Sequence, residues 1–161
     1  MKIKYLALII FGFILEFSRD YLFININLQI DYLDNLTNNI DIVNYTDSIV
    51  LVLLKGMTIK SLNNLKWILS FLYILLYFFI GLAFSYISFD SKKHTQFLKI
   101  FFNGGIIMLI LSFSIYNIGR LFNLETELNF YYISLEISHF LQSLLYPTSF
   151  LLVFWSLNKI K

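Results

Sequence analysis

The sequence contains no cysteine, a single proline and few charged residues. The lack of cysteine excludes disulfides, thiol catalysis and Cys-ligated zinc or iron–sulfur sites. Charged residues make up 14% of the 161 residues, against roughly 25% in a soluble domain. Hydrophobic residues reach 58%, with 18 Phe and 11 Tyr. This composition excludes soluble enzymes and disordered proteins and indicates an integral membrane protein.

Arginine and alanine are also scarce. Two arginines among 12 basic residues and a net charge of +2 leave no basic stripe of the kind that neutralises phosphates, so we expect no nucleic-acid partner. Alanine occurs twice, whereas Ile, Asn, Lys, Phe and Tyr are frequent. This bias is expected of an AT-rich genome and indicates a bacterial source.

Four apolar segments approach the length of about 20 residues that a helix needs to cross a hydrocarbon core of roughly 30 Å. They are residues 5–26, 67–89, 100–119 and 130–157, within one membrane domain of residues 1–161. Lys2 and Lys4 before the first segment resemble the start of a signal peptide, but no small-residue cleavage site follows. We therefore expect a retained first helix and an all-α bundle of four transmembrane helices.

Lysine and arginine near the ends of these segments indicate the orientation of the chain. One side carries seven of them, Lys2, Lys4, Lys92, Lys93, Lys99, Lys159 and Lys161. The other side carries five, Arg19, Lys55, Lys60, Lys66 and Arg120. Because cytoplasmic loops are richer in these residues, both termini are predicted on the cytoplasmic side of a bacterial inner membrane.

Residues 27–66 form the predicted first outer loop, which is too long for a simple turn. Its first half, from Asp31 to Asp47, is rich in Asn and Asp. Ile49 to Leu54 are apolar but too few to span a membrane, so we expect a short interfacial or re-entrant helix, with Lys55 and Lys60 at the headgroup level. A cap packed over the end of the bundle is the alternative interpretation.

Charged residues inside a span cost about 2.5 to 3.5 kcal/mol each at the helix centre, so each needs a partner or a function. Glu16, Arg19 and Asp20 share one face of the first helix and can partly neutralise one another. Arg19 lies about 22 Å beyond Lys4 at the rise of an α-helix, which places it in the outer leaflet. Arg120 and the outer half of the last span reach the same depth.

We therefore predict an outward-facing polar pocket. Its candidate catalytic residues are Glu136 and His139, and its candidate binding residues are Glu16, Arg19, Asp20, Asn117, Arg120 and Gln142. Alternatively, these charges only hold helices together or reach the headgroups. The spacing Glu136-x-x-His139 matches that of di-iron helical bundles but occurs once, so we expect neither a metal nor a cofactor.

Three further motifs give local predictions. Pro147 is expected to kink the last span near Ser143. Asn103-Gly104-Gly105 predicts a close helix contact rather than a phosphate loop, because no strand precedes it and the P-loop Lys is missing. His94, beside two lysines, predicts a solvated loop.

Three functions are compatible with these residues. The first is a non-catalytic subunit or accessory factor of a larger membrane complex, because neither a nucleotide motif nor a complete catalytic set is present. The second is an intramembrane enzyme or a binder of anionic lipid or lipid phosphate, in which Arg19 and Arg120 would hold the anion. The third is a proton or ion pathway. The expected partners are the lipid bilayer, a membrane protein or a second copy of the chain, and in the second case an anionic lipid.

Overall fold

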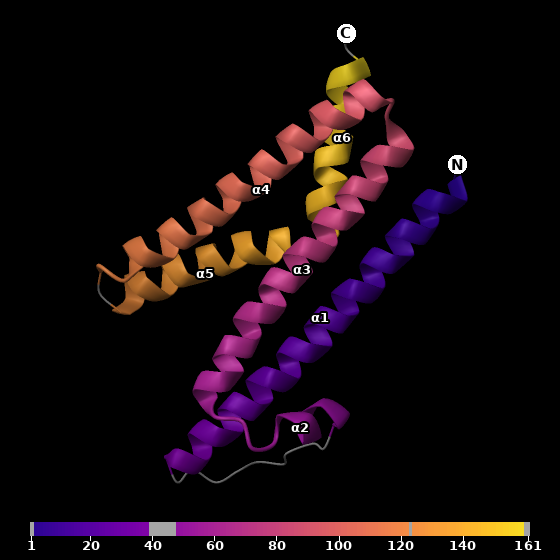
Figure 1. Ribbon diagram of the computed structural model, residues 1–161. Helices are drawn as coiled ribbons and strands as arrows, with labels where there is room; N and C mark the ends of the chain where they lie inside the picture. Colours follow the sequence, from indigo (N-terminus) through magenta and orange to yellow (C-terminus); the bar gives the residue numbers. More distant parts are fainter. Residues whose placement is uncertain (1, 39–47, 123, 160–161) are drawn as a thin grey trace. The chain divides into compact units, whose positions relative to one another are not determined.

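The computed structural model describes residues 2–38, 48–122 and 124–159. Within these ranges the chain is helical and contains no strand, which confirms the predicted all-α class. Figure 1 shows the six helices of this part of the chain: α1 (Lys2–Thr37), α2 (Ile49–Leu54), α3 (Ile59–Ser88), α4 (Ser91–Gly119), α5 (Leu124–Leu141) and α6 (Leu145–Lys159). Residues 39–47 of the predicted outer loop, and Lys161, lie outside the described residues.

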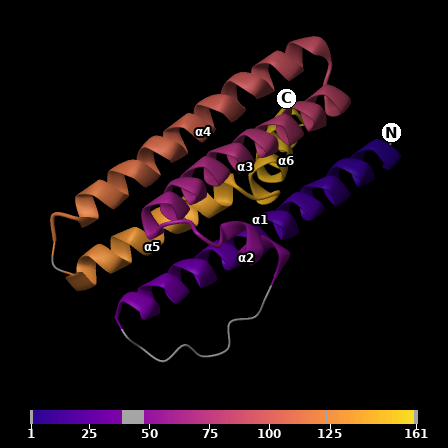
Figure 2. The same ribbon diagram turned by 60° about the horizontal axis from the view of Figure 1, so that its bottom comes forward.

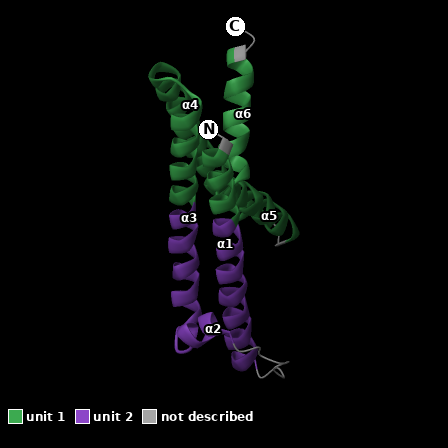
Figure 3. Cartoon of the chain, turned by 90° about the vertical axis from the view of Figure 1, so that its right-hand side faces the viewer, with its two compact units in different colours: residues 1–13, 74–161 green, residues 14–73 purple. Residues whose placement is uncertain are grey.

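The chain divides into two compact units, coloured separately in Figure 3. Unit 1 comprises Met1–Phe13 and Ile74–Lys161, and unit 2 comprises Ile14–Tyr73. The hydrophobic core of unit 1 contains Ile74, Phe97, Phe101, Leu141, Tyr146 and Phe154. The core of unit 2 contains Ile26, Leu54 and Leu62. Each unit therefore buries an apolar cluster of its own, and α1 and α3 contribute residues to both units.

Two of the described helices, α3 and α4, are long and apolar enough to cross a membrane. Helices α5 and α6 meet the same criterion only when they are taken together, with a bend of 69° between them. Helix α1 is not among these helices, because Glu16, Arg19 and Asp20 interrupt its apolar sequence. The described residues thus provide two candidate spans, or three if the bent pair counts as one, as expected of a membrane protein.

The bend between α5 and α6 follows from Pro147. Proline lacks an N–H group, and its ring clashes with the carbonyl four residues earlier, which belongs here to Ser143. The helix breaks at residues 142–144, and Pro147 falls in the first turn of α6, where a backbone N–H has no partner within the helix. The predicted kink near Ser143 is therefore present, as a break between two helices.

Helices α4 and α5 lie side by side and antiparallel in both views (Figures 1 and 2). Gly105, Ser112 and Gly119 lie on the buried face of α4 at intervals of seven residues. A Cβ atom on Gly119 would lie 2.5 Å from the Cβ of Phe130 on α5. Small residues let membrane helices approach closely, and this spacing keeps them on one face of α4.

The glycine pair of α4 also lies at close contacts with α3 and α6. A Cβ atom on Gly105 would come within 2.4 Å of the Phe78 ring, and one on Gly104 within 2.6 Å of the Phe150 ring. The close helix contact predicted for Asn103-Gly104-Gly105 is therefore confirmed. The Tyr146 hydroxyl of α6 donates to the carbonyl of Phe101 across this contact, and joins α6 to α4 by a buried hydrogen bond.

Helix α2 coincides with the short apolar helix predicted from the sequence. The hydroxyl of Ser48 accepts a hydrogen bond from the Leu51 N–H at 3.2 Å and thereby caps the helix. Leu51 and Leu54 are buried in unit 2, whereas Ile49 and Leu53 are 82% and 75% exposed. One face of α2 thus packs on the unit and the other presents apolar side chains, as an interfacial helix would require.

Candidate functional site

The three predicted binding residues of α1 belong to unit 2 and are partly paired. Both Nε and Nη2 of Arg19 donate to Oδ1 of Asp20, at 3.0 and 2.7 Å. The Arg19 side chain is only 12% exposed, whereas that of Asp20 is 53% exposed. Glu16 lies half-buried one turn earlier. Arg19 therefore shares its charge with the adjacent carboxylate of Asp20. The predicted cluster relied on residues one helical turn apart, whereas this pair joins two neighbouring residues.

Unit 2 also contains polar residues of α1 that the sequence reasoning missed. Asn25 and Gln29 are 4% and 2% exposed. Asn25 donates to the Tyr21 carbonyl at 2.7 Å and accepts from the Ser48 hydroxyl, which joins α1 to the start of α2. Their spacing of four residues was the available signal, because it places two amides on one face of a helix.

The other predicted residues belong to unit 1. Asn117 and Arg120 lie at the end of α4, both exposed, and the Asn117 amide donates to the Phe113 carbonyl one turn back at 2.7 Å. Glu136 and His139 are one turn apart on α5, with Glu136 exposed and His139 half-buried. In the described part of the chain, neither Arg120 nor Glu136 has an oppositely charged partner within 4.0 Å.

Gln142 follows the last turn of α5 and is 2% exposed. Its amide nitrogen donates to the carbonyl and the hydroxyl of Ser138, at 3.2 and 2.8 Å. The side chain therefore folds back onto the end of α5, at the break that precedes α6. Because the α1 residues belong to unit 2 and the other five to unit 1, their convergence in one outward-facing pocket stays a prediction.

His94 corrects a prediction, because it belongs to α4 and not to a solvated loop. It is half-buried, and its Nδ1 atom lies 2.8 Å from the hydroxyl oxygen of the buried Ser85 on α3. The Ser85 hydroxyl donates to the Leu82 carbonyl at 3.0 Å. A hydroxyl has a single proton, so Nδ1 of His94 is the donor in the contact with Ser85 when that proton lies on the bond to Leu82. The histidine thus joins the end of α3 to the start of α4.

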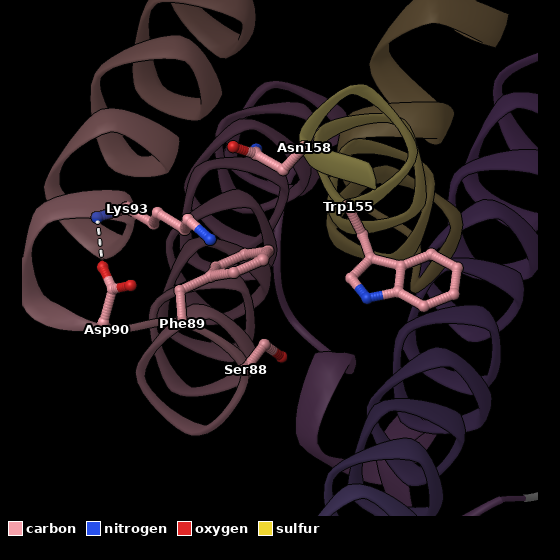
Figure 4. A pocket seen from close by; sticks show the side chains of 6 residues that line it. All are labelled: Ser88, Phe89, Asp90, Lys93, Trp155 and Asn158. Carbon is pink, nitrogen blue, oxygen red and sulfur yellow. Dashed lines mark hydrogen bonds between the residues drawn. The ribbon is translucent and has the colours of Figure 1, made fainter. Parts of the chain in front are cut away.

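A second cluster of polar groups lies at one end of unit 1, where α3 ends, α4 begins and α6 ends. A pocket of about 230 Å³ opens there, and Figure 4 shows the six residues that line it: Ser88, Phe89, Asp90, Lys93, Trp155 and Asn158. Asp90 caps α4 by accepting the Lys93 backbone N–H at 2.9 Å, the bond drawn in Figure 4. Residues far apart in the sequence therefore build this pocket together, which sequence spacing alone could not indicate.

The start of α1 is hydrogen-bonded to the same end of unit 1. The Ser88 hydroxyl donates to the Phe84 carbonyl at 2.6 Å, so the Tyr5 hydroxyl, at 2.9 Å, donates to Ser88. On the other side, the ring of Phe89 meets that of Phe154 on α6 edge to face at 5.0 Å. These contacts hold the start of α1, the α3–α4 turn and the end of α6 together.

The described residues contain no group of three or more His, Asp or Glu side chains that could hold a metal ion. Comparison of the chain with protein-family models, with curated proteins and with solved structures gives no match.

Proposed function

We propose that the chain is a small polytopic membrane protein that acts as a non-catalytic subunit or accessory factor of a larger membrane complex. The observation that carries this proposal is the exposure of α4. Only 17% of its most apolar stretch is buried within the chain, against 39% for α3. A candidate span that contacts so little of its own chain has most of its surface available for a helix of another protein.

The pattern of residues on the exposed face of α4 supports a protein neighbour. Ile107 and Ile110 are 64% and 61% exposed, and Asn103 and Asn117 are exposed on the same face. Asn103, Ile110 and Asn117 recur at intervals of seven residues, the period of helices that pack along a seam. Asparagine on such a seam can form hydrogen bonds with a partner helix inside a membrane.

We further propose a four-helix bundle in a bacterial inner membrane, with both termini on the cytoplasmic side. In this arrangement α1 crosses the membrane although it carries charges, because the ion pair between Arg19 and Asp20 lowers the cost of placing them there. The bent pair of α5 and α6 forms the last crossing, with its break enclosed by other helices. The excess of lysine at the two termini and at the α3–α4 turn supports this orientation.

Purification in mild detergent followed by mass spectrometry of the co-purifying chains tests the proposed function. We expect a second membrane protein in a fixed ratio. The variant Ile107→Trp, on the exposed face of α4, should lose this partner, whereas Phe71→Trp, at a position of α3 that is 60% exposed, should retain it. A monomer, or an assembly of this chain alone, would overturn the proposal, as would equal retention by both variants.

A further inference from the structure

The pocket at the α3–α4 turn lies at a membrane surface if α3 and α4 cross the membrane, because one candidate span ends and the next begins beside it. Ser88 is the last residue of α3, and α4 begins at Ser91. The first nine residues of α4 contain Lys92, Lys93 and Lys99 and no acidic residue. The pocket therefore lies where lipid headgroups are found, beside an excess of positive charge.

The walls of the pocket combine rigid aromatic surface with available hydrogen-bond donors. Phe89 is held by the rings of Phe97 and Phe154, at centroid distances of 5.7 and 5.0 Å. Asn158 uses one amide hydrogen on the Phe154 carbonyl at 2.8 Å, which leaves a second amide hydrogen. Figure 4 shows the Lys93 side chain extending from the start of α4 to the edge of the Phe89 ring. Among the described residues, Lys93 has no carboxylate within 4.0 Å of its ammonium group.

We propose that this pocket binds the phosphate group of an anionic phospholipid from the adjacent leaflet, through the Lys93 ammonium and the Asn158 amide. Lysine is a common point-charge ligand of phosphate, and the amide hydrogen adds a directed bond. Trp155 also lines the pocket and is 49% exposed. Tryptophan is enriched in membrane proteins at the level of the lipid headgroups. At about 230 Å³ the pocket is smaller than the roughly 300 to 1,000 Å³ of small-molecule sites, and it suits a headgroup rather than a whole metabolite.

The carboxylate of Asp90 distinguishes the lipid from free phosphate. It lines the same pocket, and it disfavours a ligand with two negative charges. A phospholipid phosphodiester carries one charge at neutral pH, whereas inorganic phosphate is partly doubly charged. Together with the position between two candidate spans, this selects the membrane lipid as the source of the phosphate.

Quenching of Trp155 fluorescence by brominated lipid tests the proposal in the full chain. The variant Trp67→Phe removes the only other tryptophan, so the emission reports on the pocket. The protein is placed in bilayers that contain brominated phosphatidylglycerol or brominated phosphatidylcholine at equal fractions. We expect stronger quenching by phosphatidylglycerol, and Lys93→Gln should reduce this preference about fivefold, the effect of one lysine near an anionic surface.

The matched control is Lys92→Gln, because Lys92 is exposed and adjacent in sequence but does not line the pocket. It should retain the preference for phosphatidylglycerol, and helix content and thermal unfolding should be the same in both variants. If both variants lost the preference for phosphatidylglycerol to the same extent, the preference would reflect diffuse charge attraction, and the proposal would be overturned. Reversal of the quenching by millimolar inorganic phosphate would assign the pocket to the free anion and also overturn it, as would equal quenching by the two lipids.

Discussion

Ser112 on α4 and Ser134 on α5 exchange two hydrogen bonds with each other's backbone. Each hydroxyl donates to the carbonyl of the other residue at 2.9 Å, and the two hydroxyl oxygens lie 3.0 Å apart. Both residues are 8% exposed. Because the two bonds use both hydroxyl protons, the pair satisfies its own donors without water. It fixes the register of α4 against α5 where the small residues of α4 allow a close approach.

Removing either hydroxyl should weaken the α4–α5 contact. We expect Ser112→Ala and Ser134→Ala each to lower the free energy of unfolding by about 0.6 kcal/mol, the average for a hydrogen bond between membrane helices, with an upper value near 1.7 kcal/mol. Equilibrium unfolding in mixed micelles measures the free energy of unfolding of each variant. The double variant then gives the coupling energy between the two serines. Ser156→Ala, at an exposed position of α6, is the control and should leave the free energy unchanged.

A side chain at Gly105 should destabilise unit 1. The Cβ of Gly105→Ala would lie 2.4 Å from the Phe78 ring and 2.8 Å from the Tyr146 hydroxyl, which is held by the Phe101 carbonyl. Overpacking of this kind costs about 1 to 3 kcal/mol. Thermal unfolding in detergent is the measurement, and Val153→Phe, which adds volume at a position of α6 that is 60% exposed, should leave the transition unchanged. An unaltered transition for Gly105→Ala would contradict the packing at this contact.

Helix positions could be predicted from the sequence because long apolar runs without charges have few alternatives in a membrane. The predicted span 67–89 lies within α3 except for its last residue, Phe89, and the apolar run Ile49–Leu54 forms α2. Pro147 indicated the break between α5 and α6, since the effect of proline on a helix is local. The division into two units was not indicated by the sequence, because it depends on which helices pack together.

Side-chain partners could be predicted only where they lie on one helix. The pair of Arg19 and Asp20 joins two neighbouring residues within the charged cluster of α1, whereas the contacts of His94 with Ser85 and of Asn25 with Ser48 join different helices. Neither contact leaves a periodic signal in a single sequence. The predicted convergence of α1 with α4 and α5 depends on contacts of the same kind.

Ser48 should control the stability of α2. Its hydroxyl caps the helix and donates to Asn25, so Ser48→Ala removes both bonds at once. Loss of such a cap costs about 0.5 to 2 kcal/mol, and amide hydrogens of Leu51 to Leu54 should exchange correspondingly faster. Thr58→Ala is the matched control, because the Thr58 hydroxyl accepts the Ser61 N–H at the start of α3. Faster amide exchange in α2 for Thr58→Ala would contradict this role. An unchanged exchange rate in α2 for Ser48→Ala would also contradict it.

The proton of His94 should reside on Nδ1 whenever the ring is neutral. We expect this because a Ser85 hydroxyl that donates to the Leu82 carbonyl at 3.0 Å can only accept from the ring. Nitrogen-15 chemical shifts of the imidazole distinguish the two tautomers directly. Ser85→Ala should remove the preference, whereas Ser91→Ala, exposed at the first turn of α4, should preserve it. A neutral ring protonated on Nε2 in the unaltered chain would show that the hydroxyl donates to the histidine instead.

The absence of cysteine makes the proposed orientation testable with single introduced thiols. Asn38 follows α1, and Ser91 begins α4; both are exposed, so a thiol at either position can react in a folded chain. If both termini are cytoplasmic, a membrane-impermeant reagent added to intact cells should label Asn38→Cys and not Ser91→Cys. Permeabilised cells provide the control, because both variants should then be labelled. Labelling of Ser91→Cys alone would reverse the orientation, and labelling of both positions in intact cells would show that α3 does not separate them across the membrane.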